Sequence, residues 1–476
     1  MNSLEVQHSL DVVKLASQVR DFYKSRTKFR IYHGGTNSTR AQRFELGKTL
    51  DTGGLNRIIE INVEKRYAIV EPSVSMGELV EETLKKGLIP SVVMEFPEIT
   101  VGGGVQGGAG ESSSFRYGLF HECCEEYDLI LGDGETVRAS RTLNPDLFWG
   151  TACSYGTLGV LVQVKVRLIP AKKYVRIKYT KVEGGNLALD LIGGYVKKDL
   201  DFLDGILFSS TSGVVMEGSL SDGANLPVET FSKVSDEWFY LHAKQVIQKQ
   251  PVFEELIPLK DYLFRYNRAA FWAGKYVFSR FHLPMLRVIR TILNPFLTTK
   301  RLYRILHATN ISQQYIIQDI SVPKEKAVQF LEYIDTQLHI FPLWICPLRT
   351  EEKACLAPNF IKTDLAINVG IWGETKKGFS KFLQTNRDLE EFTENIGGRK
   401  VLYAHTYYPE EEFWKIYDKD WYEELRKKYK AEVVFPTIFE KVYVQGRYVS
   451  TVGRGLIKLV RNKLAKSFHF APNDEA

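Results

Sequence analysis

The fold of this chain is decided by a glycine-rich stretch, Thr100-Val-Gly-Gly-Gly-Val-Gln-Gly-Gly-Ala-Gly-Glu-Ser112. Six of its thirteen residues are glycine, and each glycine costs conformational entropy on folding. Such a run is useful where the main chain must approach a ligand closely and point bare N–H groups at phosphate oxygens. Because bulky apolar residues flank the stretch, we interpret it as a binding loop for a pyrophosphate-bearing cofactor rather than a flexible linker.

Gly102, Gly104 and Gly107 also satisfy the dinucleotide-binding pattern G-x-G-x-x-G, which is a weak signal alone. The context argues against a Rossmann turn, since no clear strand–turn–helix unit surrounds these glycines. Two further loops of small residues, 33–38 and 154–159, lie upstream and downstream. Together the three loops indicate a nucleotide laid along a groove of one α+β domain.

The composition is that of an ordinary globular protein of two or three domains, with 476 residues, 44% hydrophobic and 25% charged. Neither a signal peptide nor an apolar run long enough to span a bilayer is recognisable, which favours a cytoplasmic location. Five cysteines without C-x-x-C spacing indicate reduced thiols. Nine scattered histidines lack metal-ligand spacing, so no metal site is expected.

Short strands and one well-marked helix are predicted in the first third of the chain. Ser75 and Glu78 form a capping box that begins a helix ending near Gly87. Alternating or β-branched runs predict strands at 57–62, 67–71, 127–131, 135–138 and 160–168. The pattern is that of an α+β domain.

The residues also carry a family resemblance. The order of the three loops resembles the FAD-binding domain of the vanillyl-alcohol oxidase, or p-cresol methylhydroxylase-like (PCMH-type), flavoproteins. The stretch 100–120 is similar in detail to the Δ24-sterol reductase, or Diminuto, family. Further matching motifs lie at 169–175, 318–323, 342–347, 412–414 and 422–426, and the resemblance covers roughly residues 19–442.

This resemblance implies a two-subdomain PCMH-type FAD-binding domain followed by an α+β substrate (cap) domain. It implies noncovalent FAD, because Asn37 occupies the place where covalent relatives carry a histidine. It also implies NADPH as electron donor and reduction of a side-chain double bond of a sterol or sterol-like isoprenoid. The residues expected to contact FAD are Gly34, Gly35, Thr36, Asn37 and Ser38 in the first loop, Thr100, Val101, Gly102, Gly103, Gly104, Val105, Gln106, Gly107, Gly108, Ala109, Gly110, Glu111 and Ser112 in the second, and Gly156, Gly159 and Val160 in the third.

A proton donor is expected beside the substrate. An unactivated alkene accepts hydride only if a proton meets the charge that develops on the neighbouring carbon. At positions that match the family, the candidates are Tyr407, Tyr403 and Asp319, with Glu95 as a further one. The two tyrosines could equally be core residues facing one side of a strand, and Asp319 could simply end a buried strand.

Two basic segments predict contact with a membrane. Residues 262–304 contain nine lysines and arginines, no acidic residue and many interleaved aromatic and aliphatic residues. Residues 451–470 place an apolar helical stripe among further basic residues. We expect these segments to lie on the surface of an intracellular, endoplasmic-reticulum-like membrane. A solvated basic face is the alternative, and nucleic acid is not expected because no binding module is present.

The expected domains are an FAD-binding domain over 1–171, a substrate domain over 172–411, a segment returning to the FAD-binding domain over 412–445 and a basic tail over 446–476. Two other functions remain open. One is a flavin dehydrogenase or oxidase acting on a polar alcohol, such as a sugar or hydroxy acid. The other is a non-catalytic paralogue that binds FAD or lipid. Apolar strands expected at 341–347 and 365–372 argue against the first of these.

Overall fold

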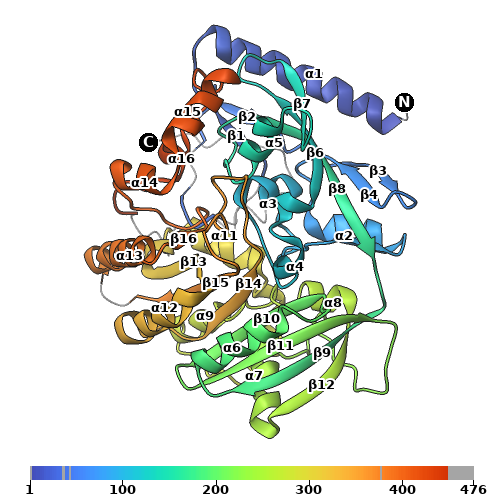
Figure 1. Cartoon of the computed structure of the whole chain (residues 1–476), viewed down its shortest axis with the longest axis vertical. Coiled ribbons are helices and arrows are strands. Elements are labelled where there is room, and N and C mark those ends of the chain that lie inside the picture. Colours follow the sequence, from blue (N-terminus) through green and yellow to red (C-terminus); the bar gives the residue numbers. More distant parts are fainter. Residues whose placement is uncertain (1–2, 35–37, 42–43, 376–377, 449–476) are drawn as a thin grey trace.

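The computed structural model describes residues 3–34, 38–41, 44–375 and 378–448. The chain forms two main sheets with helices around them, so the predicted α+β class is confirmed (Figure 1). The part of the chain with described structure contains no helix whose length and apolar character would let it cross a membrane. The predicted basic stripe at 451–470 lies outside the described residues.

The first sheet has the strand order β3-β4-β8-β6-β7, with β5 pairing beside β8. Its strands are β3 (Ile58–Asn62), β4 (Tyr67–Val70), β5 (Leu88–Pro90), β6 (Cys124–Ile130), β7 (Thr136–Ser140) and β8 (Val160–Pro170). The predicted strands of this region and the Ser75 capping box are confirmed. A separate parallel pair joins β1 (Arg30–Tyr32) to β2 (Thr49–Asp51).

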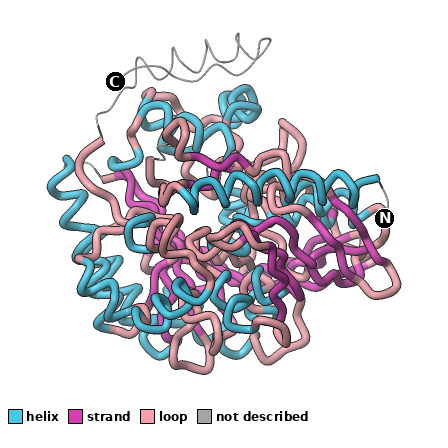
Figure 2. The backbone as a smooth tube through the Cα atoms, turned by 90° about the horizontal axis from the view of Figure 1, so that it is seen from above, coloured by secondary structure: helices cyan, strands magenta, loops and turns pink. Residues whose placement is uncertain are grey.

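Five helices accompany the first sheet: α1 (Ser3–Lys24), α2 (Met76–Leu84), α3 (Val101–Gly107), α4 (Ser114–Tyr117) and α5 (Pro145–Thr151). Seen from above, α1 lies along the outside of the molecule (Figure 2). The glycine-rich stretch, which we expected to be a loop, is helical over α3. Glycine is a poor helix former, so packing around α3 has overridden its propensity.

The second sheet is antiparallel throughout, with the order β12-β9-β11-β10-β14-β15-β13-β16. Its strands are β9 (Tyr174–Val182), β10 (Phe202–Ser209), β11 (Ser212–Ser221), β12 (Val252–Pro258), β13 (Tyr315–Pro323), β14 (Leu343–Leu348), β15 (Ala366–Glu374) and β16 (Arg399–Lys400). Apolar strands at 341–347 and 365–372 were predicted, and β14 and β15 confirm them.

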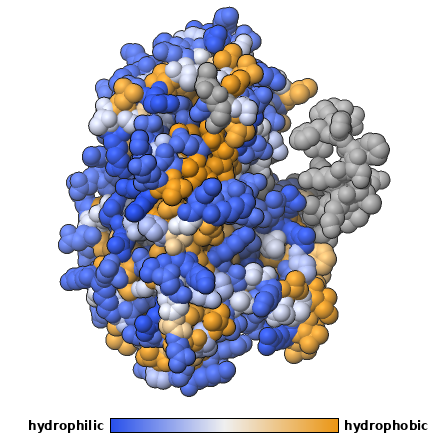
Figure 3. Space-filling view, turned by 90° about the vertical axis from the view of Figure 1, so that its right-hand side faces the viewer, coloured by the Kyte–Doolittle hydropathy of each residue, from blue (hydrophilic) through white to orange (hydrophobic). Residues whose placement is uncertain are grey.

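Helices on one face of the second sheet, α6 (Gly185–Tyr195), α12 (Ala327–Tyr333) and α13 (Gly378–Asn395), share a hydrophobic core with it. The main core continues from the first sheet through α7 (Phe239–Lys249) and Trp344 on the other face. Between β12 and β13 the chain forms α8 (Leu259–Leu263), α9 (Gly274–Arg280), α10 (Arg287–Leu293) and α11 (Thr299–Thr309). One side of the molecule is mostly hydrophilic, with a band of hydrophobic side chains near its middle (Figure 3).

The last helices are α14 (Glu410–Ile416), α15 (Lys419–Lys428) and α16 (Ile438–Val442), and α15 contacts α5 beside the first sheet. The Tyr422 hydroxyl donates to Thr157 Oγ1 over 2.8 Å, and Arg426 donates to the Thr157 carbonyl oxygen over 2.8 Å. The Phe29 amide donates to the carbonyl oxygen of Val434 over 2.9 Å. The segment 412–445 thus contacts residues that precede position 171.

A buried ion cluster ties the glycine-rich stretch to the second sheet. The guanidinium of Arg265, which is 1% exposed, lies 3.0 Å from Glu111 Oε1 and 2.9 Å from Asp204 Oδ2. Asp204 also accepts hydrogen bonds from the Tyr266 hydroxyl over 2.9 Å and from Trp344 Nε1 over 3.0 Å. Because Glu111 follows α3 and Asp204 lies in β10, the cluster fixes the position of α3 relative to β10.

Replacing Arg265 by methionine should destabilise the protein by about 3–5 kcal/mol, because two buried carboxylates lose their cation. The measurement is the free energy of unfolding in urea. The matched control is Arg176→Met, which removes the partly exposed pair with Glu254 and should cost about 1 kcal/mol or less. Equal effects of the two substitutions would contradict a structural role for the buried cluster.

Candidate active site

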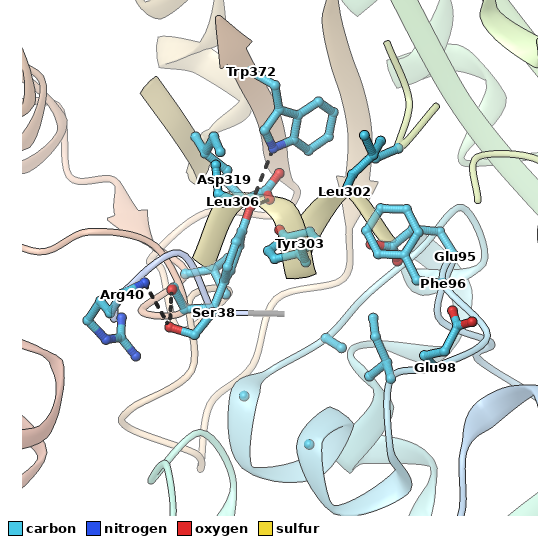
Figure 4. A pocket seen from close by; sticks show the side chains of 18 of the residues that line it. Ser38, Arg40, Glu95, Phe96, Glu98, Leu302, Tyr303, Leu306, Asp319 and Trp372 are labelled. Atoms are coloured by element: carbon cyan, nitrogen blue, oxygen red, sulfur yellow. Dashed lines mark hydrogen bonds between the residues drawn. The ribbon is translucent and has the colours of Figure 1, made fainter. Parts of the chain in front are cut away.

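A cavity of about 470 Å³ lies between the first sheet's part of the molecule and the second sheet. Its floor is the glycine-rich stretch, and its walls come from β13, β14 and β15 together with α9 and α11. Most of the lining side chains are apolar or aromatic, among them Phe96, Phe271, Leu302, Leu306, Trp344 and Trp372. Figure 4 shows polar groups entering this cavity from opposite sides.

The first amides of α3 are already used inside the protein. Thr100 caps the helix, and its side chain accepts a hydrogen bond from the Gly103 amide over 3.1 Å. The Val101 and Gly102 amides donate to the carbonyl oxygens of Val74 and Pro72 over 2.9 Å and 2.8 Å. The predicted phosphate contacts through the amides of residues 101–103 therefore do not fit this helix start.

The glycines of α3 instead allow close packing on one side and leave open space on the other. A Cβ at Gly102 would lie 2.7 Å from Pro72 Cβ, and one at Gly104 would lie 2.5 Å from Met94 Cε. At Gly107, which lines the cavity, a Cβ would meet no atom within 4 Å. Gly103 and Gly107 are one helical turn apart, so they present bare backbone to the cavity.

About half of the residues predicted to contact FAD line this cavity. Those that do are Ser38, Thr100, Gly102, Gly103, Gln106, Gly107, Gly108, Ala109, Gly110 and Gly156. Those that do not are Gly34, Val101, Gly104, Val105, Glu111, Ser112, Gly159 and Val160. Val101, Val105 and Val160 are core residues, and Glu111 belongs to the Arg265 cluster. Gly35, Thr36 and Asn37 lie outside the described residues, so the noncovalent attachment stays a prediction.

Several polar atoms beside the glycine face have no hydrogen-bond partner among the residues that the structure describes. They are His33 Nδ1, Gln106 Nε2 and Glu98 Oε2, which are buried and belong to residues lining the cavity. Buried polar groups are normally hydrogen-bonded, so these atoms indicate a polar ligand. The bare face of Gly103 and Gly107 and these atoms together fit an FAD molecule.

Two cations at this end of the cavity were not predicted from the sequence. Burial, together with Arg30 and Arg40, lowers the pKa of Lys441 to about 7. Burial and the charge of Lys441 lower the pKa of His33 to about 4, so this ring is neutral at neutral pH. Arg40 donates to the carbonyl oxygen of Ala404 over 2.7 Å, and also to that of Leu402. Lys441 and Arg40 are suited to an anionic part of a ligand.

Asp319 and Tyr403 form a hydrogen-bonded pair in the cavity wall. The Tyr403 hydroxyl donates to Asp319 Oδ2 over 2.6 Å, and Asn368 donates to Asp319 Oδ1 over 3.2 Å. Burial raises the pKa of Asp319 to about 6 and that of Tyr403 well above its usual value. The Trp372 indole donates to the Tyr403 oxygen over 3.4 Å. This pair can hold a proton at the cavity surface.

Local structure around these two residues differs from the sequence-based expectation. Asp319 lies in the middle of β13, not at the end of a strand. The residues directly before and after it in β13 are buried. Tyr403 lies in a turn after the short strand β16. Its backbone carbonyl oxygen accepts a hydrogen bond from the Ser38 hydroxyl over 3.0 Å. The first glycine loop and the Asp319–Tyr403 pair are therefore adjacent.

Tyr407, the third predicted catalytic residue, is not part of the cavity lining. The strand expected to place Tyr403 and Tyr407 on one face is absent, since residues 401–407 form turns and irregular backbone. Gln313 Nε2 donates to the Tyr407 hydroxyl over 3.3 Å, and the ring packs against Phe382 in the core beside the second sheet. The assignment of Tyr407 as a proton donor is therefore corrected.

Glu95 lies across the cavity from Asp319, with Tyr303 between them (Figure 4). Burial raises the pKa of Glu95 to about 8, aided by the negative charges of Glu111 and Asp319. Glu95 is therefore a mostly neutral carboxylic acid at neutral pH. It is a second group that can donate a proton into the cavity.

A cluster of His121, Glu122 and Glu351 brings potential metal-ligand atoms within 4.8 Å of one another, away from the cavity lining. Arg349 already lies 2.6 Å from Glu122 Oε2, and Asn359 donates to Glu122 Oε1 over 3.1 Å. Although burial opposes it, neighbouring Cys153 and Glu351 raise the pKa of His121 to about 10. The cluster is thus a set of internal ion pairs.

The comparison with protein families defines the class of the molecule. Residues 11–140 match the family described as "FAD binding domain", which includes α3 and most of the first sheet. The chain is therefore an FAD-dependent oxidoreductase.

Its relatives define the family more closely. The Delta(24)-sterol reductase of Arabidopsis thaliana is 31% identical over 445 residues, covering 84% of this chain and 77% of that protein. The Delta(24)-sterol reductase of Homo sapiens is 29% identical over 460 residues, covering 93% and 87%. A Delta(24)-sterol reductase homologue of Caenorhabditis elegans is 28% identical over 478 residues, covering 94% and 90%. The chain belongs to the Delta(24)-sterol reductase family.

The two sides of α3 predict opposite effects of adding a methyl group. Gly104→Ala should destabilise the protein by about 1–3 kcal/mol, because its Cβ would overlap Met94 and Phe120. Gly107→Ala should leave stability unchanged or raise it by up to about 1 kcal/mol, because alanine favours the helix. The same methyl group would enter the cavity and weaken FAD binding by roughly tenfold or more.

Thermal unfolding of the FAD-free proteins measures the first effect, and fluorescence titration with FAD measures the second. If Gly107→Ala binds FAD as tightly as the unaltered protein does, the bare face of α3 is not where the cofactor lies.

Proposed function

We propose that this protein reduces the side-chain (Δ24) double bond of a sterol or sterol-like isoprenoid, using noncovalently bound FAD and NADPH as electron donor. One observation carries the proposal. A single apolar cavity joins the bare backbone face of Gly103 and Gly107 to a buried carboxyl–phenol pair, Asp319 and Tyr403. The names of the relatives supply the substrate class.

The residues that would hold FAD lie at the polar end of the cavity. Gly103 and Gly107 permit close approach, Gln106 and His33 offer unpartnered polar atoms, and Lys441 offers a cation to phosphate. FAD bound there would supply hydride-transfer chemistry, carrying hydride from NADPH to one carbon of the double bond. The protein's task is then to supply a proton to the other carbon and to exclude water.

Tyr403 Oη is the atom from which the proton leaves. Its O–H bond breaks as a C–H bond forms on the substrate, and a protonated Asp319 restores the phenol across their 2.6 Å hydrogen bond. The raised pKa of Asp319 keeps its proton available in mildly acidic solution. Asn368 holds the carboxyl in place from the neighbouring strand β15.

The walls of the cavity favour a sterol over a polar alcohol. The rings of Phe271, Trp344 and Trp372 pack against one another on the side formed by the second sheet. Leu302 and Leu306 of α11 line the same cavity. Oxidation of a sugar or hydroxy acid would need several hydrogen bonds to the substrate's hydroxyl groups, and these walls offer few.

We also propose that the protein meets its substrate at the surface of an intracellular membrane of the endoplasmic-reticulum type. The basic segment 262–304 supports this location, since it has no acidic residue among nine cations. The second basic segment, 451–470, lies outside the described residues.

Anaerobic mixing with NADPH should bleach the visible absorbance of the flavin, and subsequent addition of desmosterol should restore it. Each step reports one half-reaction by the absorbance spectrum. Bleaching without recovery would contradict the sterol as substrate but keep the flavoenzyme. No bleaching by NADPH would contradict this electron donor, and a protein without a flavin spectrum would contradict the cofactor.

The rate of flavin reoxidation by the sterol should fall as pH rises, with a midpoint of about 6. The sign follows because burial raises the pKa of Asp319, so this group carries a proton below that pH and loses it above. Tyr403→Phe should slow reoxidation by about 100-fold or more, and Asp319→Asn should abolish the pH dependence.

Reduction of the flavin by NADPH in the same variants is the control, because it needs no proton from this pair. A midpoint near pH 8 that disappears in Glu95→Gln would instead assign the proton donor to Glu95.

A further inference from the structure

Large apolar side chains are exposed in one short segment between α9 and α11. Of eighteen such side chains among the described residues, six fall within residues 281–296. They are Phe281 (59% exposed), Leu283 (37%), Leu286 (60%), Val288 (71%), Ile292 (66%) and Phe296 (53%), and we call them the apolar lip. Monomeric proteins rarely leave so many apolar side chains together in water, so the lip indicates a binding surface.

Cations surround the lip without any acidic residue of the same segment to balance them. Arg280, Arg287, Lys300, Arg301 and Arg304 are exposed, and no acidic residue occurs between Asp261 and Asp319. Arg290 is different, because it is buried and pairs with Glu237 over 2.5 Å. Apolar side chains framed by lysine and arginine fit the interfacial region of a bilayer that contains anionic lipids.

The lip adjoins the cavity. Phe281 is both exposed and part of the cavity lining, and the preceding Arg280 also reaches the lining. Tyr276 and Val277 of α9 line the same cavity. The same segment therefore separates the exposed apolar lip from the cavity that contains the Asp319–Tyr403 pair.

Helix α11 completes this wall. Its Leu302, Tyr303 and Leu306 point into the cavity (Figure 4), whereas Lys300, Arg301 and Arg304 are exposed on its outer side. The side chains of a helix repeat every three to four residues, so the apolar and basic positions separate onto opposite faces. A lipid surface at the basic face would lie one helix diameter from the cavity.

We propose that the apolar lip inserts into an anionic lipid bilayer and that α9 and α11 form the entrance through which a sterol passes from the bilayer into the cavity. The identity of the substrate as a sterol rests on the proposed function. Insertion of the apolar lip into a bilayer does not depend on that function. A sterol taking this path exchanges lipid for the aromatic walls of the cavity and avoids the cost of entering water.

The binding experiment uses the full chain with FAD and sedimentation with vesicles of phosphatidylcholine, with or without phosphatidylserine. Binding should require phosphatidylserine and weaken as salt rises. The variant Leu286→Glu/Val288→Glu/Ile292→Glu should bind about tenfold more weakly or worse, because three exposed apolar groups become anions. All three side chains are exposed, and an unchanged melting temperature checks that folding is intact.

A matched variant tests the position. Helix α1 also exposes Val6, Leu10 and Val13, at 44%, 60% and 64%. The variant Val6→Glu/Leu10→Glu/Val13→Glu makes the same change of charge and should keep vesicle binding. The proposal is overturned if only the α1 variant loses binding, or if the lip variant binds as the unaltered protein does. It is equally overturned if the lip variant merely dissociates an oligomer that does not bind vesicles.

Delivery of the substrate separates this proposal from the proposed function. The lip variant should reoxidise its reduced flavin normally with sterol supplied in cyclodextrin, and about tenfold more slowly with sterol embedded in vesicles. If flavin reoxidation in the lip variant slows equally with sterol in cyclodextrin and in vesicles, the proposed entrance at α9 and α11 is overturned. Failure of the unaltered protein with both forms would reject the sterol substrate, while sedimentation would still decide whether the lip binds lipid.

Discussion

The buried ion cluster around Arg265 is the constraint on which the cavity depends. One guanidinium lies between Glu111, directly after the glycine-rich stretch, and Asp204 of β10. Burial raises the pKa of Glu111 and opposes its ionisation, so the cation must stay close to keep the charges compensated. The cluster therefore holds α3 at a fixed distance from the second sheet, and the space left between them is the cavity.

Burial shifts the pKa values of four ionisable groups in the cavity lining in the direction of neutrality. Burial raises the pKa of Asp319 to about 6 and that of Glu95 to about 8, while it lowers the pKa of Lys441 to about 7 and that of His33 to about 4. These shifts favour the neutral forms of the four groups, which suits an apolar substrate. Lys441 stays close enough to its titration point to become fully charged beside a phosphate group.

Local sequence patterns predicted the local structure well. Alternation along 160–168 predicted β8, and the Ser75–Glu78 pair predicted the start of α2, because both signals depend on neighbouring residues alone. The helix in the glycine-rich stretch was missed, since contacts with Pro72, Met94 and Phe120 override the low helix propensity of glycine.

Long-range packing also decided the part of the site that the sequence did not reveal. Tyr403 and Tyr407 had the same standing in the sequence, yet a turn sends only Tyr403 to Asp319. Lys441 gave no signal at all, because it reaches the cavity through the packing of α16 about 400 residues along the chain from β1.

The proton donor and the entrance place opposite demands on the same cavity. A raised pKa at Asp319 requires that water be kept out, whereas a large apolar substrate requires an opening at α9 and α11. An apolar substrate satisfies both demands, because it displaces the water that an open cavity admits. Its arrival further disfavours the carboxylate form of Asp319, so the acid is most fully protonated when there is an alkene to receive the proton. The supply of a proton from Asp319 is thereby coupled to the presence of substrate in the cavity.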